Sequence, residues 1–176
     1  MILKNVMEQY FNKLIAKWGE FNGTLPLVPW NEEVDPHIYV GSQDEEGYIA
    51  WKPLEKDKNT NFQQFEQEMN IILHADLKAY FNSFWFLEMI GWVSEYNVNL
   101  YPVTPGVEPE AFFQRVKDYI LEKEKSVYIP VGFESNGMLI VMNNQSGGIF
   151  IENYEDESYE YLSSNLKELI SQLDFN

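Results

Sequence analysis

The sequence contains no cysteine, a single arginine and two histidines among its 176 residues. Without cysteine the chain forms no disulfide, offers no thiolate nucleophile and holds no cysteine-ligated zinc. Lys and Arg together number 12 against 28 acidic residues, for a formal net charge of −16. Because binding to nucleic acids and to anionic lipids depends on basic side chains, we expect neither nucleic-acid binding nor direct membrane insertion.

The common motifs of phosphate binding and nucleophilic catalysis are also missing. The sequence has no GxGxxG, no GK[ST] and no GxSxG. His37 and His74 stand far apart, so capping or packing is favoured for each over metal binding or base catalysis. The acidic run Asp44-Glu45-Glu46 lacks the alternating ligand spacing of a calcium loop. We therefore expect no catalytic residue, no cofactor and no metal, and a protein that is not an enzyme.

No apolar run is long enough to cross a bilayer. The longest, residues 84–93, is broken by Glu88 and is too short. The first residues have the pattern of a helix rather than a signal peptide, because Glu8 comes early and no small-residue cleavage site follows. The expected location is the cytoplasm, with any attachment to the cytoplasmic side of the membrane made through a partner.

Hydrophobic residues make up 45% of the chain and aromatic residues 16%, which is enough for the packed core of one domain spanning residues 1–176. Trp18, Trp51 and Trp85 fall in apolar patterns typical of a core. The patterns around Trp30 and Trp92 do not assign these two residues to the core. The acidic excess attracts basic protein surfaces and speeds encounter with them. The alternative is that acidity serves solubility alone.

Apolar periodicity and turn residues predict the secondary structure. Helices are predicted at residues 1–18, from 62 to 72, at 108–125 and from 162 to 173. Residues 77–84 are predicted to form a further helix or a continuation of the one from 62. Strands are predicted at 38–41, 48–53, 84–92, 96–103, 127–133, 138–143 and 148–153. Residues 25–30, with two prolines, are predicted to form a rigid apolar loop, and residues 153–161 an acidic loop. Since strands come in runs joined by tight turns, we predict one α+β domain with an antiparallel-rich mixed sheet packed by helices.

An ordered series of features along most of the chain resembles the Syd family, within the superfamily that includes the Smi1/Knr4 proteins. In chain order these features are Trp18, Gly23-Thr24-Leu25-Pro26, Trp30-Asn31, Asp35-Pro36, residues 47–53, Phe62, Phe65, Glu66, residues 73–77, Tyr80-Phe81, residues 142–147 and 162–166, Leu169 and Ile170. The chain departs from the family pattern at three places. His37 stands where cysteine is usual, Thr104-Pro105-Gly106 replaces a tryptophan-containing stretch, and residues 121–127 are shorter and less basic.

The resemblance implies a non-enzymatic cytosolic protein. Syd-type members bind SecY, the channel subunit of the protein translocon, with an acidic concave face set against basic cytosolic loops, and regulate or monitor the channel. Other branches of the superfamily neutralise toxins by direct binding, and the departures keep an immunity protein open as the alternative. A third hypothesis, a small-ligand enzyme with a tryptophan-lined pocket, has no motif behind it. The oligomeric state is not predicted.

A basic partner is best met by exposed acids in polar loops around an apolar centre. Three loops of the sequence offer such acids. The candidate partner-binding residues are Trp30, Glu32, Glu33, Asp35, Asp44, Glu45, Glu46, Glu155, Asp156 and Glu157. We expect them to converge on one concave face, with Trp30 near its centre; the alternative for each acid is a solvated surface position.

Overall fold

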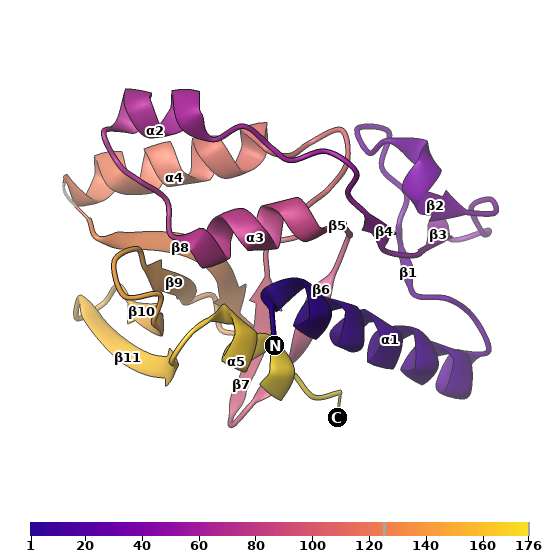
Figure 1. Ribbon diagram of the computed structural model, residues 1–176. Helices are drawn as coiled ribbons and strands as arrows, with labels where there is room; N and C mark the ends of the chain where they lie inside the picture. The colour runs from indigo at the N-terminus through magenta and orange to yellow at the C-terminus, as the bar shows by residue number, and fades with distance from the viewer. Residues whose placement is uncertain (125, 176) are drawn as a thin grey trace.

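The computed structural model describes residues 1–124 and 126–175 and has the α+β architecture of Figure 1. Its main element is a six-stranded sheet, here called the large sheet. The strands are β6 (Met89–Val93), β7 (Tyr96–Leu100), β8 (Tyr128–Glu134), β9 (Leu139–Asn143), β10 (Ile149–Asn153) and β11 (Ser158–Ser163), in the order β11-β10-β9-β8-β7-β6. Every strand pair in the described residues is antiparallel, so the predicted antiparallel-rich α+β fold is confirmed.

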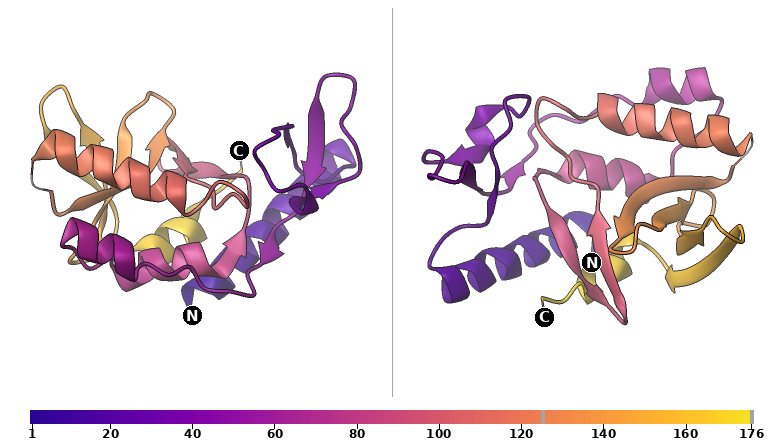
Figure 2. Two further views of the ribbon diagram at one scale, coloured as in Figure 1. Left: turned by 90° about the horizontal axis from the view of Figure 1, so that it is seen from above. Right: turned by 180° about the vertical axis from the view of Figure 1, so that it is seen from behind.

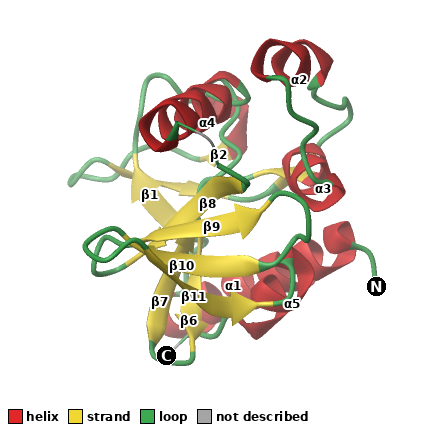
Figure 3. Ribbon diagram, turned by 90° about the vertical axis from the view of Figure 1, so that its left-hand side faces the viewer, coloured by secondary structure: helices red, strands yellow, loops and turns green. Residues whose placement is uncertain are grey.

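The large sheet is strongly curled (Figure 3). The closing helix α5 (Leu166–Gln172) contacts both border strands, β6 and β11, so the sheet bends around it. A side-chain bond also spans the curl: the Tyr96 hydroxyl, at the start of β7, donates to Oε1 of Glu160 on β11 over 2.8 Å. Side chains on the inner face of the curl are fully buried, for example Val98, Ile140 and Ile149.

Four further helices pack around this sheet. The long α1 (Leu3–Asn22) and α3 (Ala75–Ser83) contact one another, and α1 also contacts α5. On another side, α4 (Glu110–Lys123) contacts β8, and α2 (Gln63–Met69) packs on α4 through the stacked rings of Phe65 and Phe113, whose centroids are 4.3 Å apart. Aromatic rings thus join the helices into one core with the sheet.

A second sheet, here called the small sheet, lies apart from the large one at the far end of α1 (Figure 1). It contains β1 (Leu27–Pro29), β2 (Tyr39–Val40) and β3 (Tyr48–Trp51) in the order β1-β3-β2, with a 3₁₀ turn, η1 (Pro36–Ile38), before β2. The prediction of a rigid loop at residues 25–30 is therefore wrong. Proline is tolerated because β1 is a border strand, where a missing N–H leaves no inner partner unpaired.

Three other boundaries differ from the predictions. The first helix continues past Gly19 and ends at Asn22, where Gly23 takes a left-handed φ of 66°. Residues 158–161 belong to β11, not to a loop, and α5 begins only at Leu166 behind the cap residue Asn165. The strand predicted at 84–92 is divided into β5 (Phe84–Trp85) and β6, and the partner of β5, the short strand β4 (Leu54–Glu55), was not predicted. Strands β4 and β5 have only two residues each, too few for a period to show.

The two borders of the large sheet differ in whether another segment pairs with them. Along β6, Trp92 exchanges two backbone hydrogen bonds with Asp174, of 2.8 and 3.1 Å, so the end of the chain covers this border. No strand of the described residues pairs with the outer border of β11. Among the described helices, none combines the length and the apolar character needed to cross a membrane.

Candidate partner-binding face

Two of the three acidic loops meet at one end of the small sheet. The Trp30 backbone N–H, just after β1, donates to the carbonyl of Gly47, just before β3, over 2.9 Å. This bond places the loop with Glu32 and Glu33 beside the hairpin turn with Glu45 and Glu46. All four of these glutamates are exposed, and Trp30 itself is 44% exposed.

Two of the candidate aspartates hold these loops in shape. Asp44 Oδ1 accepts backbone N–H bonds from Glu46 (2.9 Å) and Tyr48 (2.8 Å), which closes the β2–β3 turn. Asp35 caps η1 by accepting from the His37 N–H over 3.3 Å and also contacts the His37 ring. Their carboxylates therefore set the backbone from which the neighbouring glutamates project.

A hollow of about 240 Å³ lies beside the small sheet. It is lined by Val28, Pro29, Asn31, Glu33, Val34, Tyr39, Leu87, Thr104 and Val107. The Asp35 N–H donates to the Pro105 carbonyl over 2.9 Å, which ties the two sides together at its rim. Gly106 is needed there: its φ is +89°, and a Cβ would lie 2.7 Å from the Glu33 carbonyl oxygen.

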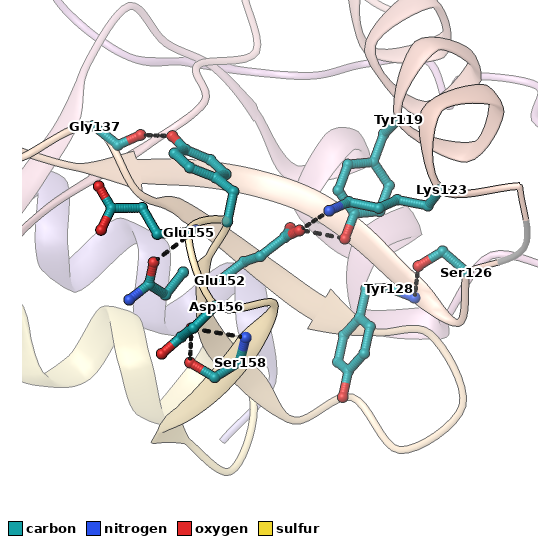
Figure 4. A network of polar contacts seen from close by, with 11 residues as sticks. Tyr119, Lys123, Ser126, Tyr128, Gly137, Glu152, Glu155, Asp156 and Ser158 are labelled. Carbon is teal, nitrogen blue, oxygen red and sulfur yellow. Dashed lines mark hydrogen bonds and ion pairs between the residues drawn. The ribbon is translucent and has the colours of Figure 1, made fainter.

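The third acidic loop lies elsewhere. Glu155, Asp156 and Glu157 form the turn between β10 and β11, not a loop leading directly into the last helix. Asp156 Oδ1 accepts from the Ser158 N–H (3.1 Å) and hydroxyl (2.5 Å), and these bonds lower the pKa of Asp156. The Tyr154 hydroxyl donates to the Gly137 carbonyl, which joins this turn to the β8–β9 turn (Figure 4).

The structure thus brings the first two groups of acids together and leaves the third at the opposite end of the molecule. Seen from above, in the left panel of Figure 2, the β2–β3 hairpin and the β10–β11 hairpin extend in the same direction from opposite ends. The hollow itself is lined by residues of the small sheet and its following loop on one side, and by Leu87 and the segment before α4 on the other. Trp30 belongs to the small-sheet side of this arrangement rather than to its middle.

A buried polar network supports the β10–β11 end (Figure 4). Glu152 on β10 is only 1% exposed; its carboxylate accepts from the Tyr119 hydroxyl over 2.9 Å and forms an ion pair with Lys123, both on α4. The bond with Glu152 raises the pKa of Lys123, and burial, followed by hydrogen bonds, raises the pKa of Tyr119. A buried carboxylate is tolerated here because it is both paired and hydrogen-bonded.

His74 has the contacts of a structural residue. His74 caps α3, where its Nδ1 accepts the Asp76 N–H over 3.1 Å, and its ring packs against Gly147; the predicted capping or packing role is confirmed. In residues 1–124 and 126–175, no group of three or more His, Cys, Asp or Glu side chains is placed to hold a metal ion. Trp51 is fully buried, as predicted.

Sequence reasoning missed the lining of the hollow. Tyr39, Leu87 and Thr104 come from three separate segments, and only the folded chain brings them together. The one signal in the sequence was the Pro105-Gly106 pair, which was interpreted only as a departure from the Syd pattern. A glycine that follows proline also permits close approach of another backbone segment, which is its role against Glu33.

Comparison with known proteins identifies the family. The family described as Syd protein (SUKH-2) matches residues 3–174. Protein Syd of Idiomarina loihiensis is 23% identical over 91% of this chain and 89% of its own length. Protein Syd of Colwellia psychrerythraea is 25% identical over 96% and 88%, and that of Hahella chejuensis 20% identical over 96% and 91%. Because the family match covers nearly the whole chain, this protein belongs to the Syd (SUKH-2) family.

Proposed function

We propose that the chain is a non-enzymatic binding protein that recognises basic cytosolic loops of SecY and thereby regulates or monitors the translocon. Family membership supports a Syd-type role. The observation that carries the proposal is the placement of exposed carboxylates on hairpins that extend in the same direction from the two ends of the molecule. In this proposal the protein acts in the cytoplasm and reaches the membrane surface through its partner.

Affinity on such a face comes from many small contributions. Exposed ion pairs are worth about 0–1 kcal/mol each, so no single acid decides binding. The net charge of −16 steers a basic partner toward the face before contact. The hollow beside Glu33 then offers apolar walls from Val28, Val34 and Leu87, which supply the non-electrostatic part of the interface.

The test is association with purified SecY of the same cell, embedded in lipid nanodiscs. Reversal of Glu45 and Glu46 to Lys leaves the Asp44 turn bonds intact and is expected to slow association about tenfold at low salt. Reversal of Glu155 and Glu157 to Lys tests the other hairpin. The matched control is Glu8→Lys with Glu20→Lys, which changes the net charge equally on the exposed face of α1.

High salt is the second arm. With a Debye length of about 8 Å at physiological ionic strength, the wild-type association rate is expected to fall steeply as salt is raised. The double reversals are expected to show a flatter salt dependence. If both reversals bind as the control does, and the wild-type rate does not change with salt, acidic complementarity is not the mode of recognition.

One observation favours the second candidate, an immunity protein that binds a basic toxin domain. The Thr104-Pro105-Gly106 departure from the Syd pattern lies at the hollow, where Thr104 lines the wall and Gly106 contacts Glu33. A change of residues there alters the shape offered to a partner. Co-expression with a toxin encoded by a neighbouring gene tests this: rescue of growth, lost on Glu45→Lys with Glu46→Lys, supports the immunity role.

A further inference from the structure

The outer border of β11 is a sheet edge with two distinct faces. In the β10–β11 register Tyr159 lies opposite Glu152 and Tyr161 opposite Phe150, so these side chains share one face. Glu160 lies opposite Ile151 and points to the other face, where it accepts from Tyr96. An open edge of this kind presents backbone N–H and C=O groups that can pair with another strand.

Four aromatic rings form a continuous row on the outer face next to this edge. Tyr128 stacks on Tyr159 with centroids 4.1 Å apart, and the Phe150 ring meets Tyr128 at 5.8 Å and Tyr161 at 5.9 Å. Helix α4 reaches this face at Glu152 through Tyr119 and ends at Lys123. Tyr161, at the border, is 61% exposed. Exposed ring faces attract Lys and Arg side chains.

The charge along the border indicates which occupant fits. Residues 153–163 contain four acids, Glu155, Asp156, Glu157 and Glu160, and no Lys or Arg. All four are exposed. A second copy paired antiparallel to β11 sets this acidic border against an identical acidic border, and like charges on neighbouring strands are destabilising. A cationic strand is attracted instead of repelled, by Glu160 on one face and by the tyrosine rings on the other.

We propose that the free edge of β11 accepts an extended segment of a partner protein with lysine or arginine at alternate positions. Backbone hydrogen bonds to β11 align the segment, and its side chains on one face lie over Tyr159 and Tyr161. This surface shares only the β10–β11 turn with the acidic face described above and does not depend on SecY as the partner.

The probe is a labelled, end-blocked heptapeptide of alternating arginine and valine, with binding to the full chain followed by fluorescence anisotropy. Tyr161→Ala is expected to weaken binding about twofold to fivefold, the range for loss of one exposed cation–π contact. Glu160→Lys is expected to weaken it about tenfold, since one reversal removes an attraction and adds a repulsion. Glu20→Lys on α1, with the same charge change, is expected to stay within about twofold of wild type.

A second peptide isolates the strand pairing. Methylation of alternate backbone nitrogens on one edge removes the donors without changing charge, and is expected to weaken binding about tenfold or more. Equal binding of both peptides overturns the proposal, because charge alone then accounts for association. So does normal binding by the Tyr161 and Glu160 variants, or a wild-type dimer in sedimentation equilibrium that Glu160→Lys dissociates.

Discussion

The small sheet and the large sheet differ in the length of their strands and in the way they are held in the fold. The strands of the small sheet have two to four residues, and its link to the segment before α4 includes the bond from Asp35 to Pro105 and the Gly106 contact. The large sheet has strands of five to seven residues, with a face of fully buried side chains. Low burial allows loops to carry exposed charge at little cost. The candidate acids of two of the three loops lie on or beside the small sheet, while the large sheet carries the longer strands and much of the core.

The substitution with the largest expected effect on this comparison is Trp51→Ala. Trp51 is 0% exposed in a small-sheet strand, and loss of a buried tryptophan costs about 3–5 kcal/mol. We expect a lower urea midpoint, with amide exchange protection lost first in β1 and β3. Protection in β9 and β10 is expected to persist in native buffer. If protection falls equally in both sheets, they unfold as one cooperative unit and the comparison is wrong.

The next effect concerns the large sheet. Lys123→Met leaves the Glu152 carboxylate buried with the Tyr119 hydroxyl as its remaining bond, and is expected to cost about 2–3 kcal/mol of unfolding free energy. Addition of Glu152→Leu removes the stranded charge, so the double variant is expected to regain part of the loss. Denaturant unfolding of both singles and the double gives the coupling. A double variant less stable than Lys123→Met contradicts this account.

Gly106→Ala tests the junction between the two regions. A Cβ at φ +89° is strained and meets the Glu33 carbonyl, so we expect a loss of about 1–3 kcal/mol. The small sheet should then exchange amides and be cleaved by protease faster, while the large sheet keeps its protection. Gly137→Ala, at φ +90° with nothing near its Cβ, is the control for backbone strain alone. Equal behaviour of the two variants means that contact with Glu33 contributes nothing.

The smallest effect is expected at high pH. The hydrogen bond to Glu160 raises the pKa of Tyr96 from 10 to about 12. Because the folded state holds this proton more tightly than the unfolded state, its stabilising contribution is complete below pH 10 and is lost as pH rises toward 12. Tyr96→Phe is expected to lose stability less steeply across this window. If the stability of the wild type and of Tyr96→Phe changes in parallel with pH, the hydrogen bond between Tyr96 and Glu160 does not contribute.

The fold class could be predicted because the strands from β8 to β10 alternate with turn sequences, and the antiparallel meander follows from that pattern. β11 was missed because acids dominate residues 153–161, and the alternation of Tyr159 and Tyr161 with Glu160 and Leu162 was overlooked. That interpretation gave more weight to the acidic composition of the segment than to the alternation of its residues. The alternation of Tyr159 and Tyr161 with Glu160 was the better guide, because a period of two residues is typical of a strand.

The site was only partly open to sequence reasoning. The acids were placed in loops and turns, which proved to be their setting, but their distances depend on pairing between segments far apart in the chain. Trp30 and Gly47 are joined by a backbone bond that leaves no trace in residue type. In the same way, nothing in the sequence near Asp35 names Pro105 as its acceptor.

The unequal borders of the large sheet limit how the protein can assemble. An open-ended filament of strand-paired copies needs two complementary edges on each subunit, whereas one available edge ends growth after a single addition. The two bonds between Trp92 and Asp174 occupy part of the β6 border, so the proposed strand pairing is directed to β11. Deletion of the residues after Leu173 would unmask β6 and change a capped binder into a unit capable of polymerisation. In the proposed binding mode, the residues after Leu173 therefore decide which border of the large sheet accepts a partner strand.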